Sequence, residues 1–549
     1  MVDYANEYFV NIANNLTGGQ MNHEPYVHIT IPNPDSFGFL PTSIPEVTSV
    51  IKSLKNSSNG LQDISVRTLK NNSHIFSVHV MFLYNHSVEK VTYPKLLKIA
   101  RVVPGHKAGQ RDIIDNYRPF SNLPVLSKVF ETLTLRRFTS FANRCSLLSD
   151  CQFGFQRGRN ITQAAIKLTS HVTNAYHYKS YAACFFLDLK KAFDTIDHIL
   201  LLEKLYHAGF RGPSHQYVNS YLSNRKQYVQ VGQHKSSDKE ITKGVPQGSI
   251  LGPFLFCLYI NDIVEAVEAD AVLFADDAAF FVSAATLPLL YVKLRKLFVN
   301  LSAYLKTNRL IPNLKKSKLM YFSSRPCEFL EEMKFDNEII EWVEEYQYLG
   351  LIMSNKMCFS SHIQRVTSRI SRFSGVFFAL NRVLPRSILI LLYFAFIVPH
   401  LTLHIEIWGA APECHIKKLA VRQNKLLRAI LGIGFENGIP TLGTEEMYRS
   451  SRVLNLKNLF KLKLFKLLVS LLNGKLPLFY DILLRPLLSS HGYNTRAGDF
   501  RHPLIVCEVE RRAIAHQLVV LYEETPPELY DLSLKKAITH YKGHLLNSQ

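Results

Sequence analysis

Several features that would place this chain in a special class of protein are missing from its 549 residues. Its eight cysteines are scattered, and no two stand at the spacing of zinc ligands. A chain of this length needs no disulfides to stabilise its core, so we interpret the cysteines as reduced and mostly buried. We find no internal repeat and no low-complexity tract. These absences favour a globular intracellular protein over a disulfide-rich, zinc-binding or repeat protein.

Long apolar runs are also scarce. The segment 387–405 comes closest to the length that crosses a bilayer, but it contains Pro399, His400 and His404. Because proline breaks a helix, the segment predicts a buried helix that ends at 398–399. The first residues contain no basic leader followed by an apolar core, so we expect no signal peptide and no secretion.

Acidic residues are few compared with basic ones. The chain has 64 Lys and Arg against 44 Asp and Glu, a net charge of +20, while its hydrophobic share of 47% is that of a globular protein. A surface this basic attracts polyanions, because binding to a phosphate backbone releases counterions. The charge therefore favours a nucleic-acid partner, with a ribosome-binding or membrane-surface protein as the alternative.

Apolar periodicity predicts an α+β core followed by an all-α region. We expect a loosely packed lead-in over residues 1–42, a mixed region over 43–355, a basic helical region over 356–475, and a proline-broken C-terminal region over 476–549. In the mixed region the predicted helices are 121–141, 199–206, 251–263 and 287–305. The predicted strands are 100–103, 182–187, 271–274 and 279–282, and 228–231 and 241–243 are predicted to flank a hairpin turn.

Two of the predicted strands end in carboxylates. Asp188 follows the apolar run 184–187, and Asp276 and Asp277 follow the run 272–275. If these strand ends lie side by side, three carboxylates meet, and their repulsion favours hard divalent cations such as Mg²⁺. Two such ions promote phosphoryl or nucleotidyl transfer. The simpler interpretation is that Asp-Asp is a common turn sequence and that Asp188, Asp194 and Asp197 are helix-start residues.

Three motifs in order resemble those of reverse transcriptases. They are Phe-Leu-Asp-Leu-Lys-Lys-Ala-Phe-Asp at 186–194, Gly-Val-Pro-Gln-Gly-Ser-Ile-Leu-Gly-Pro at 244–253 and Phe-Ala-Asp-Asp at 274–277. Further segments resemble the jockey-like branch of non-LTR retrotransposon polymerases, namely Asn-Tyr-Arg-Pro at 116–119, Gln-Phe-Gly-Phe at 152–155, Tyr-Leu-Gly at 348–350 and Tyr-Asn-Thr-Arg at 493–496. The resemblance runs from about residue 44 to 496 and implies a right-hand polymerase, with fingers and a palm built on an antiparallel sheet, and an all-α thumb.

The resemblance also implies roles for the acidic residues. Asp188 and Asp276 would be the main ligands of two Mg²⁺ ions, with Mn²⁺ as a substitute and the Leu189 carbonyl as an additional ligand. Asp277 would either bind metal or orient the primer end. The residues Asp188, Asp276 and Asp277 are thus the predicted catalytic set of an RNA-directed DNA polymerase that extends a primer 3′-OH on an RNA template.

Other residues are assigned to substrate binding by the same resemblance. Phe193 matches a steric gate against the 2′ position of the sugar, with a core aromatic as the alternative. Gln247 and Gly248 would lie under the incoming base and template, and Lys107 and Arg118 would hold the triphosphate. Lys316 would protonate the departing pyrophosphate, although Lys315 and Lys318 fit the alignment too. Tyr348, Leu349 and Gly350 would grip the primer, and Asp194 and Asp197 are interpreted as structural.

The expected partners are an RNA template, a DNA primer or target and deoxynucleoside triphosphates, in the nucleus or cytoplasm. We expect no endonuclease domain and no ribonuclease H carboxylate set in this chain. Two alternatives remain open at this point: a catalytically inactive nucleic-acid-binding relic of the same fold, and an RNA-templated RNA polymerase, against which Phe193 argues.

Overall fold

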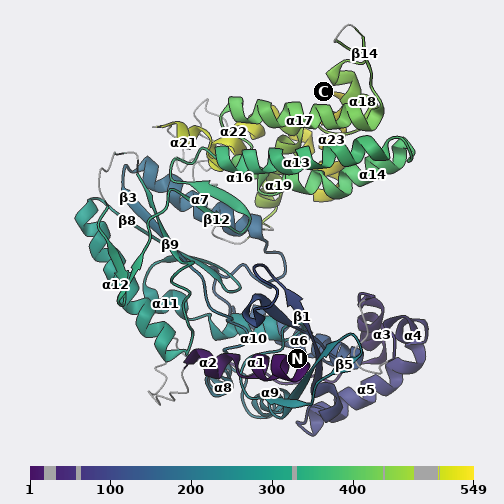
Figure 1. The fold of residues 1–549 in the computed structure, drawn as a ribbon, viewed down its shortest axis with the longest axis vertical. Helices are drawn as coiled ribbons and strands as arrows, with labels where there is room; N and C mark the ends of the chain where they lie inside the picture. Colours follow the sequence, from purple (N-terminus) through teal and green to yellow (C-terminus); the bar gives the residue numbers. More distant parts are fainter. Residues whose placement is uncertain are drawn as a thin grey trace.

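The computed structural model describes residues 1–17, 32–56, 64–323, 330–436, 439–474 and 507–548, together with residues 325, 476 and 505. It is a mixed α+β structure. In Figure 1 a four-stranded sheet and its helices occupy the left side, helices of the C-terminal part lie above, and the helices formed by residues 2–144 lie below. The predicted tail motif at 493–496 lies outside the described residues.

The four-stranded sheet has the order β7-β8-β3-β9, and all neighbours are antiparallel. Its strands are β7 (Asp270–Phe274), β8 (Asp277–Ala284), β3 (Tyr181–Leu187) and β9 (Lys318–Phe322). The alternating side chains of β3 enter two different cores: Ala182, Cys184 and Phe186 pack on one face, and Ala183, Phe185 and Leu187 on the other. Burial on both faces explains why this strand is a continuous apolar run.

Helices cover both faces of this sheet. The helix α12 (Leu287–Thr307) packs on one face, where Phe298 meets Phe185 edge-to-face with ring centroids 4.9 Å apart. The helix α7 (Ile161–His177) covers the other face. It begins with a capping box, in which Asn160 and Gln163 satisfy each other's backbone N–H groups.

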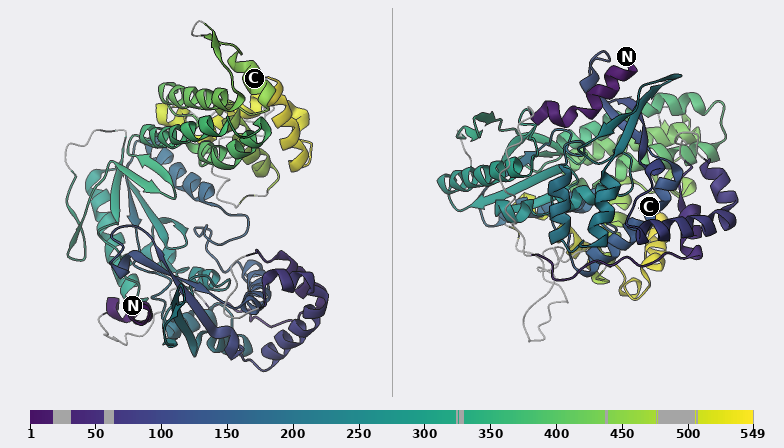
Figure 2. Two further views of the ribbon diagram at one scale, coloured as in Figure 1. Left: turned by 45° about the vertical axis from the view of Figure 1, so that its right-hand side comes forward. Right: turned by 90° about the horizontal axis from the view of Figure 1, so that it is seen from below.

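A second sheet lies beside the first and contains β2 (Tyr117–Asn122), β1 (Ile99–His106), β4 (Arg225–Val231), β5 (His234–Lys235) and β6 (Lys239–Ile241). Strands β1 and β4 are parallel, whereas β1–β2 is antiparallel. Helices α3 (Ile44–Ser53), α4 (Val66–Asn71), α5 (Ser73–Glu89), α6 (Val125–Arg144), α8 (His198–His207), α9 (Pro213–Leu222) and α10 (Gly252–Tyr259) share the core on the α12 face of the first sheet. Figure 2 shows α3–α5 at the end of the molecule opposite the C-terminal helices.

The C-terminal part is helical. It consists of α13 (Ser360–Leu380), α14 (Arg386–Phe396), α15 (Val398–Thr402), α16 (Ile405–Trp408), α17 (Glu413–Leu431), α18 (Thr444–Ser451), α19 (Leu456–Leu472), α21 (Glu508–Arg511), α22 (Ile514–Glu524) and α23 (Leu534–Asn547). A short hairpin of β12 (Glu345–Tyr348) and β13 (Leu351–Ser354) connects it to the first sheet. Buried Trp408 lies in the core shared by these helices and the α7 face of the sheet.

Three expectations from the sequence are wrong in detail. The first 17 residues are not loosely packed: α1 (Val2–Val10) and α2 (Ile12–Thr17) pack on β4, and buried Asn6 donates a hydrogen bond to the Ser237 carbonyl. The apolar pattern of the sequence did not predict this packing, because a helix as short as α1 buries only a few apolar residues, chiefly Ala5 and Phe9.

The predicted helix 251–263 is two helices, because α10 ends at Tyr259 and α11 (Ile263–Val267) begins after a turn. The predicted buried helix in 387–405 ends at Phe396, and α15 starts at Val398 with proline in its first turn. Its outer side is open to solvent, with Leu391 63% exposed. None of the helices that the structure describes is long and apolar enough to cross a bilayer.

Candidate active site

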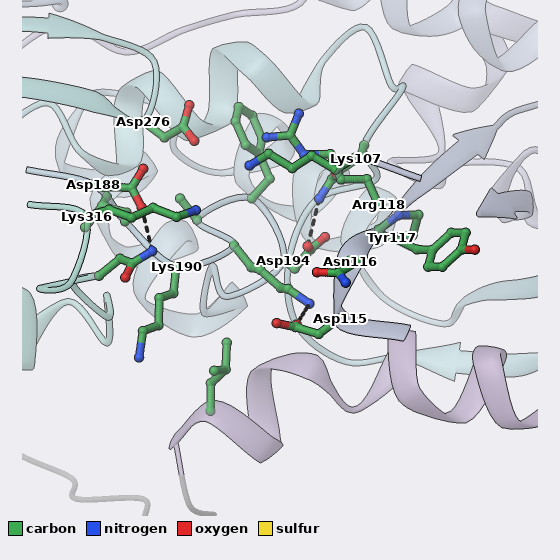
Figure 3. A pocket seen from close by; sticks show the side chains of 18 of the residues that line it. Lys107, Asp115, Asn116, Tyr117, Arg118, Asp188, Lys190, Asp194, Asp276 and Lys316 are labelled. Atoms are coloured by element: carbon green, nitrogen blue, oxygen red, sulfur yellow. Dashed lines mark hydrogen bonds and ion pairs between the residues drawn. The ribbon is translucent and has the colours of Figure 1, made fainter. Parts of the chain in front are cut away.

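Sheet register brings the predicted carboxylates to one edge. The last residue of β3, Leu187, pairs with Ala278 of β8, so Asp188 stands next to Asp277 as the strands leave the sheet. The β7–β8 turn closes with the pair Phe274–Asp277 and holds Ala275 at φ +58°. Neighbouring strands lie about 5 Å apart. In Figure 3 the carboxylates of Asp188 and Asp276 come from different strand ends and lie beside the same opening.

The electrostatics of this edge reflect crowded negative charge. Burial raises the pKa of Asp276, and the charge of Asp188 raises it further. The pKa of Asp277 rises to about 6, first through burial and then through the charges of Asp276 and Asp188. Because two causes oppose ionisation, the ionised cluster is unfavourable unless cations neutralise it.

The carboxylate of Asp188 is held in place by a neighbouring segment. The side-chain amide of Asn313 donates a 2.8 Å hydrogen bond to Asp188 Oδ2, and the backbone N–H of Asn313 donates to the Asp188 carbonyl at 2.7 Å. The backbone N–H of Asp188 in turn donates to Ser317 Oγ at 3.1 Å. Asn313 thereby leaves the second carboxylate oxygen of Asp188 available to face the pocket.

A pocket of about 680 Å³ opens beside Asp188 and Asp276. Three predicted phosphate-binding side chains, Lys107, Arg118 and Lys316, line it. Burial lowers the pKa of Lys107, as do the charges of Arg118 and Lys316, whereas Asp188 and Asp276 act in the opposite direction. Figure 3 shows Lys107 and Arg118 on one side of the opening and Lys316, Asp188 and Asp276 on the other. Such an arrangement suits a ligand with several negative charges next to the acidic edge.

The wall of the pocket contains Phe193, Asp194 and Gln247. The ring of Phe193 stacks on Phe256, with centroids 4.5 Å apart, and its surface is part of the pocket lining. The side-chain amide of Gln247 donates to Asp194 Oδ2 at 2.7 Å. Burial raises the pKa of Asp194 to about 6, and the hydrogen bond from Gln247 opposes this rise.

Gly248 lies where the backbone passes very close to another strand. It adopts φ +127°, and a Cβ at this position would stand 2.4 Å from the Ser121 carbonyl oxygen at the end of β2. The neighbouring Gln247 carbonyl accepts a 2.8 Å hydrogen bond from the Ser121 N–H. Only glycine fits this conformation and this contact. Gly248 itself does not line the pocket as the structure describes it.

The predicted primer-gripping residues Tyr348, Leu349 and Gly350 form the turn of the β12–β13 hairpin. Tyr348 is buried and donates to the Val272 carbonyl at 3.2 Å, and His404 of the helical part bonds the Leu349 carbonyl at 2.9 Å. These three residues lie outside the pocket lining. The neighbouring Tyr346 is closer to the acidic edge, since burial and then Asp188 and Asp277 raise its pKa to about 12.

The donor set is compatible with magnesium. In the described part of the chain no group of three His, Cys, Asp or Glu side chains is already arranged around one point. Asp188 and Asp276 nevertheless present a carboxylate pair to the pocket, and Leu189 lines it beside them. Mg²⁺ binds through one or two carboxylates and takes its remaining ligands from water and substrate phosphates. A carboxylate pair next to a cationic phosphate pocket therefore fits this ion.

One group of residues at the pocket was not predicted from the sequence. Tyr8 of α1 and Lys191 both donate to Asp115 Oδ1 at 2.6 Å, and Lys191 also lies 4.9 Å above the Tyr8 ring. The hydrogen bond from Lys191 lowers the pKa of Asp115. Asp115, Lys191 and Leu16 line the pocket. No sequence signal joins residues this far apart, although Lys191 lies inside the 186–194 motif.

Carboxylates at adjacent strand ends, beside a cationic pocket, are the arrangement expected of a nucleotidyl-transfer site. Comparison with known proteins is specific: residues 106–353 match the family model described as reverse transcriptase (RNA-dependent DNA polymerase). The chain is 28% identical over 413 residues to the probable RNA-directed DNA polymerase from transposon BS of Drosophila melanogaster, covering 71% of this chain and 44% of that protein. It is 28% identical over 363 residues to the polymerase from mobile element jockey of the same species, covering 64% and 39%. The corresponding X-element protein is 27% identical, covering 72% and 44%.

Residues 106–353 are thus a reverse transcriptase domain, and the chain is a distant homologue of the RNA-directed DNA polymerases of non-LTR retrotransposons. The chain spans less than half the length of these relatives.

Proposed function

We propose that this chain is an RNA-directed DNA polymerase that extends a primer 3′-OH along an RNA template with deoxynucleoside triphosphates. The observation that carries the proposal is the position of Asp188 and Asp276, on adjacent strand ends beside the pocket of Lys107, Arg118 and Lys316. The homology of residues 106–353 to reverse transcriptases supports the same chemistry.

In the proposed reaction, Asp188 and Asp276 hold divalent cations, with Asp277 beside them and the Leu189 carbonyl as a further oxygen donor. Mg²⁺ bound there, or Mn²⁺ in its place, supplies activation of the attacking hydroxyl and charge stabilisation of the leaving oxygen. Asn313 keeps Asp188 oriented. Lys107 and Arg118 bind the triphosphate, and Lys316 donates a proton or charge to the departing pyrophosphate.

The architecture is assigned by the same proposal. The sheet β7-β8-β3-β9 is the palm, the β1–β2–β4 sheet with α3–α6 forms the fingers, and α13–α19 form the thumb. Phe193 is the steric gate, Gln247 and Gly248 support the nucleotide, and the turn of Tyr348, Leu349 and Gly350 contacts the primer. The template is RNA, the primer or target is DNA, and the protein works in the nucleus or cytoplasm.

Primer extension tests this proposal. On poly(A) with an oligo(dT) primer and Mg²⁺, we expect the wild-type protein to incorporate dTTP and the variants Asp188→Asn and Asp276→Asn to lose about 10³-fold or more, since several kcal/mol of charge stabilisation disappear at 1.36 kcal/mol per tenfold. Asp531→Asn, an exposed carboxylate on the C-terminal part, is the control and should retain full activity. A folded wild-type preparation that binds the hybrid but forms no product would instead identify an inactive nucleic-acid-binding relic.

A further inference from the structure

The segment 151–155 lies beside the strand that leads to the acidic β7–β8 turn. The Phe153 N–H donates to the Leu273 carbonyl at 2.7 Å, and the bridge between this segment and β7 is parallel. Gly154 then comes so near the turn that a Cβ on it would stand 2.4 Å from the backbone nitrogen of Ala275. The segment therefore meets the β7–β8 turn at backbone distance.

The side chain of Gln152 joins the same segment to the same turn. It is fully buried, and its Oε1 accepts hydrogen bonds from the Gly154 N–H at 2.8 Å and the Ala275 N–H at 3.2 Å. Because both partners are N–H donors, the end of the amide that faces them is the oxygen. Its Nε2 is buried and has no hydrogen-bond partner among the residues that the structure describes. An unsatisfied buried donor lowers stability, so stability alone does not account for glutamine here.

The residue that Gln152 holds has a strained backbone. Ala275 is buried and adopts φ +58°, in the left-handed region that residues with a Cβ disfavour. Such a conformation persists where the surrounding structure imposes it. Asp276 and Asp277 follow Ala275 directly, so a rotation of the backbone at Ala275 would move both carboxylates.

We propose that Gln152 is a positioning residue, which holds Ala275 in its left-handed conformation and thereby keeps the carboxylates of Asp276 and Asp277 at the edge where divalent cations bind. This inference rests on the proposed function and extends it to a residue of the 152–155 motif that had no role. Gln152 lies outside the pocket lining, so its effect reaches the cations through the backbone of Ala275.

Steady-state kinetics of Gln152→Leu test this role, because leucine removes the acceptor and nearly keeps the volume. We expect kcat for dTTP to fall about 10- to 100-fold with KM for dTTP changed less than twofold, since a small misplacement of reacting groups costs up to about 10²-fold. The Mg²⁺ concentration for half-maximal rate should rise about 10-fold, as for other groups that orient metal ligands. If Gln152→Leu does not fold, Gln152→Asn, whose shorter side chain cannot reach both N–H groups, takes its place with the same expected result.

Gln156→Leu is the matched control. Gln156 belongs to the same loop and donates to the Gln152 carbonyl at 2.7 Å, but it does not bond the β7–β8 turn. Arg159 donates to the same carbonyl at 2.9 Å and remains in the variant. We expect kcat and the Mg²⁺ requirement of Gln156→Leu to stay within twofold of the wild type. Equal losses in Gln152→Leu and Gln156→Leu would overturn the positioning role.

A second substitution in the turn separates positioning from a loss of packing. Glycine adopts positive φ without steric cost and is favoured at such positions of hairpin turns. In Gln152→Leu/Ala275→Gly the turn therefore keeps its conformation without help from residue 152, and kcat should recover at least about threefold over Gln152→Leu. Repacking around a leucine at 152 would not respond to this change. A kcat that Ala275→Gly leaves unchanged or lowers further would overturn the inference.

Binding of Mn²⁺, measured by electron paramagnetic resonance without nucleotide, separates this inference from the polymerase proposal. The Mn²⁺ bound by the wild type and lost in Asp276→Asn defines the ions at the acidic edge. A Kd for these ions about 10-fold weaker in Gln152→Leu would support the inference even for a protein that extends no primer. An equal Kd in a wild type that extends primers would reject the inference and leave the polymerase proposal standing. A wild type without such ions would reject it as well.

Discussion

At the scale of single residues, the acidic edge lowers the stability of the protein when its carboxylates are ionised and no cation is bound. Asp277 is exposed, yet its pKa of about 6 lies above the ordinary value of 3.8. A carboxyl group whose pKa is higher in the folded state binds protons more strongly when folded. Its contribution to stability is therefore favourable at low pH and becomes unfavourable as the pH rises from about 4 through 6.

The raised pKa predicts how removal of the Asp277 charge changes the free energy of unfolding. In metal-free buffer at pH 8, Asp277→Asn should stabilise the protein by about 1 kcal/mol, a value kept small because solvent screens the exposed carboxylate. At pH 4 the gain should vanish, because the wild-type carboxyl is then protonated in the folded state.

Thermal unfolding with EDTA and with Mg²⁺ checks this prediction. Mg²⁺ should raise the Tm of the wild type more than that of the variant, because the cation relieves repulsion that the variant no longer has. Asp531→Asn serves as the control for loss of an exposed negative charge. A variant that is less stable than wild type at pH 8 without metal would contradict the repulsion argument.

At the scale of elements, helix α1 contacts a loop that lines the pocket. The segment between β1 and β2 carries Lys107 and Asp115, and the Lys107 N–H bonds the Asn116 carbonyl at 2.9 Å. Tyr8 of α1 and Lys191, which follows β3, both hold Asp115. The loop that carries Lys107, which we propose binds phosphate, is thereby connected to the strand end that carries Asp188.

Loss of a hydrogen bond to Asp115 should weaken nucleotide binding more than it slows the chemical step. Tyr8→Phe removes one hydrogen bond to a carboxylate, and we expect KM for dTTP to rise about 3- to 10-fold with kcat nearly unchanged. Tyr4→Phe, on an exposed position of the same helix, is the matched control and should behave as wild type. Steady-state kinetics of both variants decide the matter, and equal behaviour of the two would argue against a role for α1.

At the scale of the whole molecule, the net charge of +20 predicts that binding of nucleic acid depends strongly on salt. A protein that contacts six to ten phosphates loses roughly 10³ to 10⁵ in affinity between 50 and 200 mM salt. We expect a loss of at least about 10³-fold for an RNA–DNA hybrid, measured by fluorescence anisotropy. Asp188→Asn should show nearly the same salt slope, because the slope reports contacts of basic residues with phosphates and not the acidic edge. A loss below tenfold would show that few phosphates are bound.

The sequence by itself determined three strands of the sheet β7-β8-β3-β9 and the order of the motifs, whereas β9 was not predicted. The run 182–187 lies within β3, and Asp197 caps α8 as its position before an apolar helix predicts. These features are local, since the periodicity of apolar residues and the chemistry of a cap operate within one element. The length of 251–263 and the state of the first 17 residues were mispredicted, because turns and short helices depend on what they pack against.

Only the tertiary structure decided which distant side chains meet. Asp194 and Gln247 are 53 residues apart, and Tyr8 and Lys191 are 183 apart. Their contacts follow from strand register and from the close approach of turns at Gly244 and Gly248, which no local pattern encodes. The sequence could name the residues that chemistry needs, but the pairing that orients them depends on long-range packing, in which each contact is set by all the others.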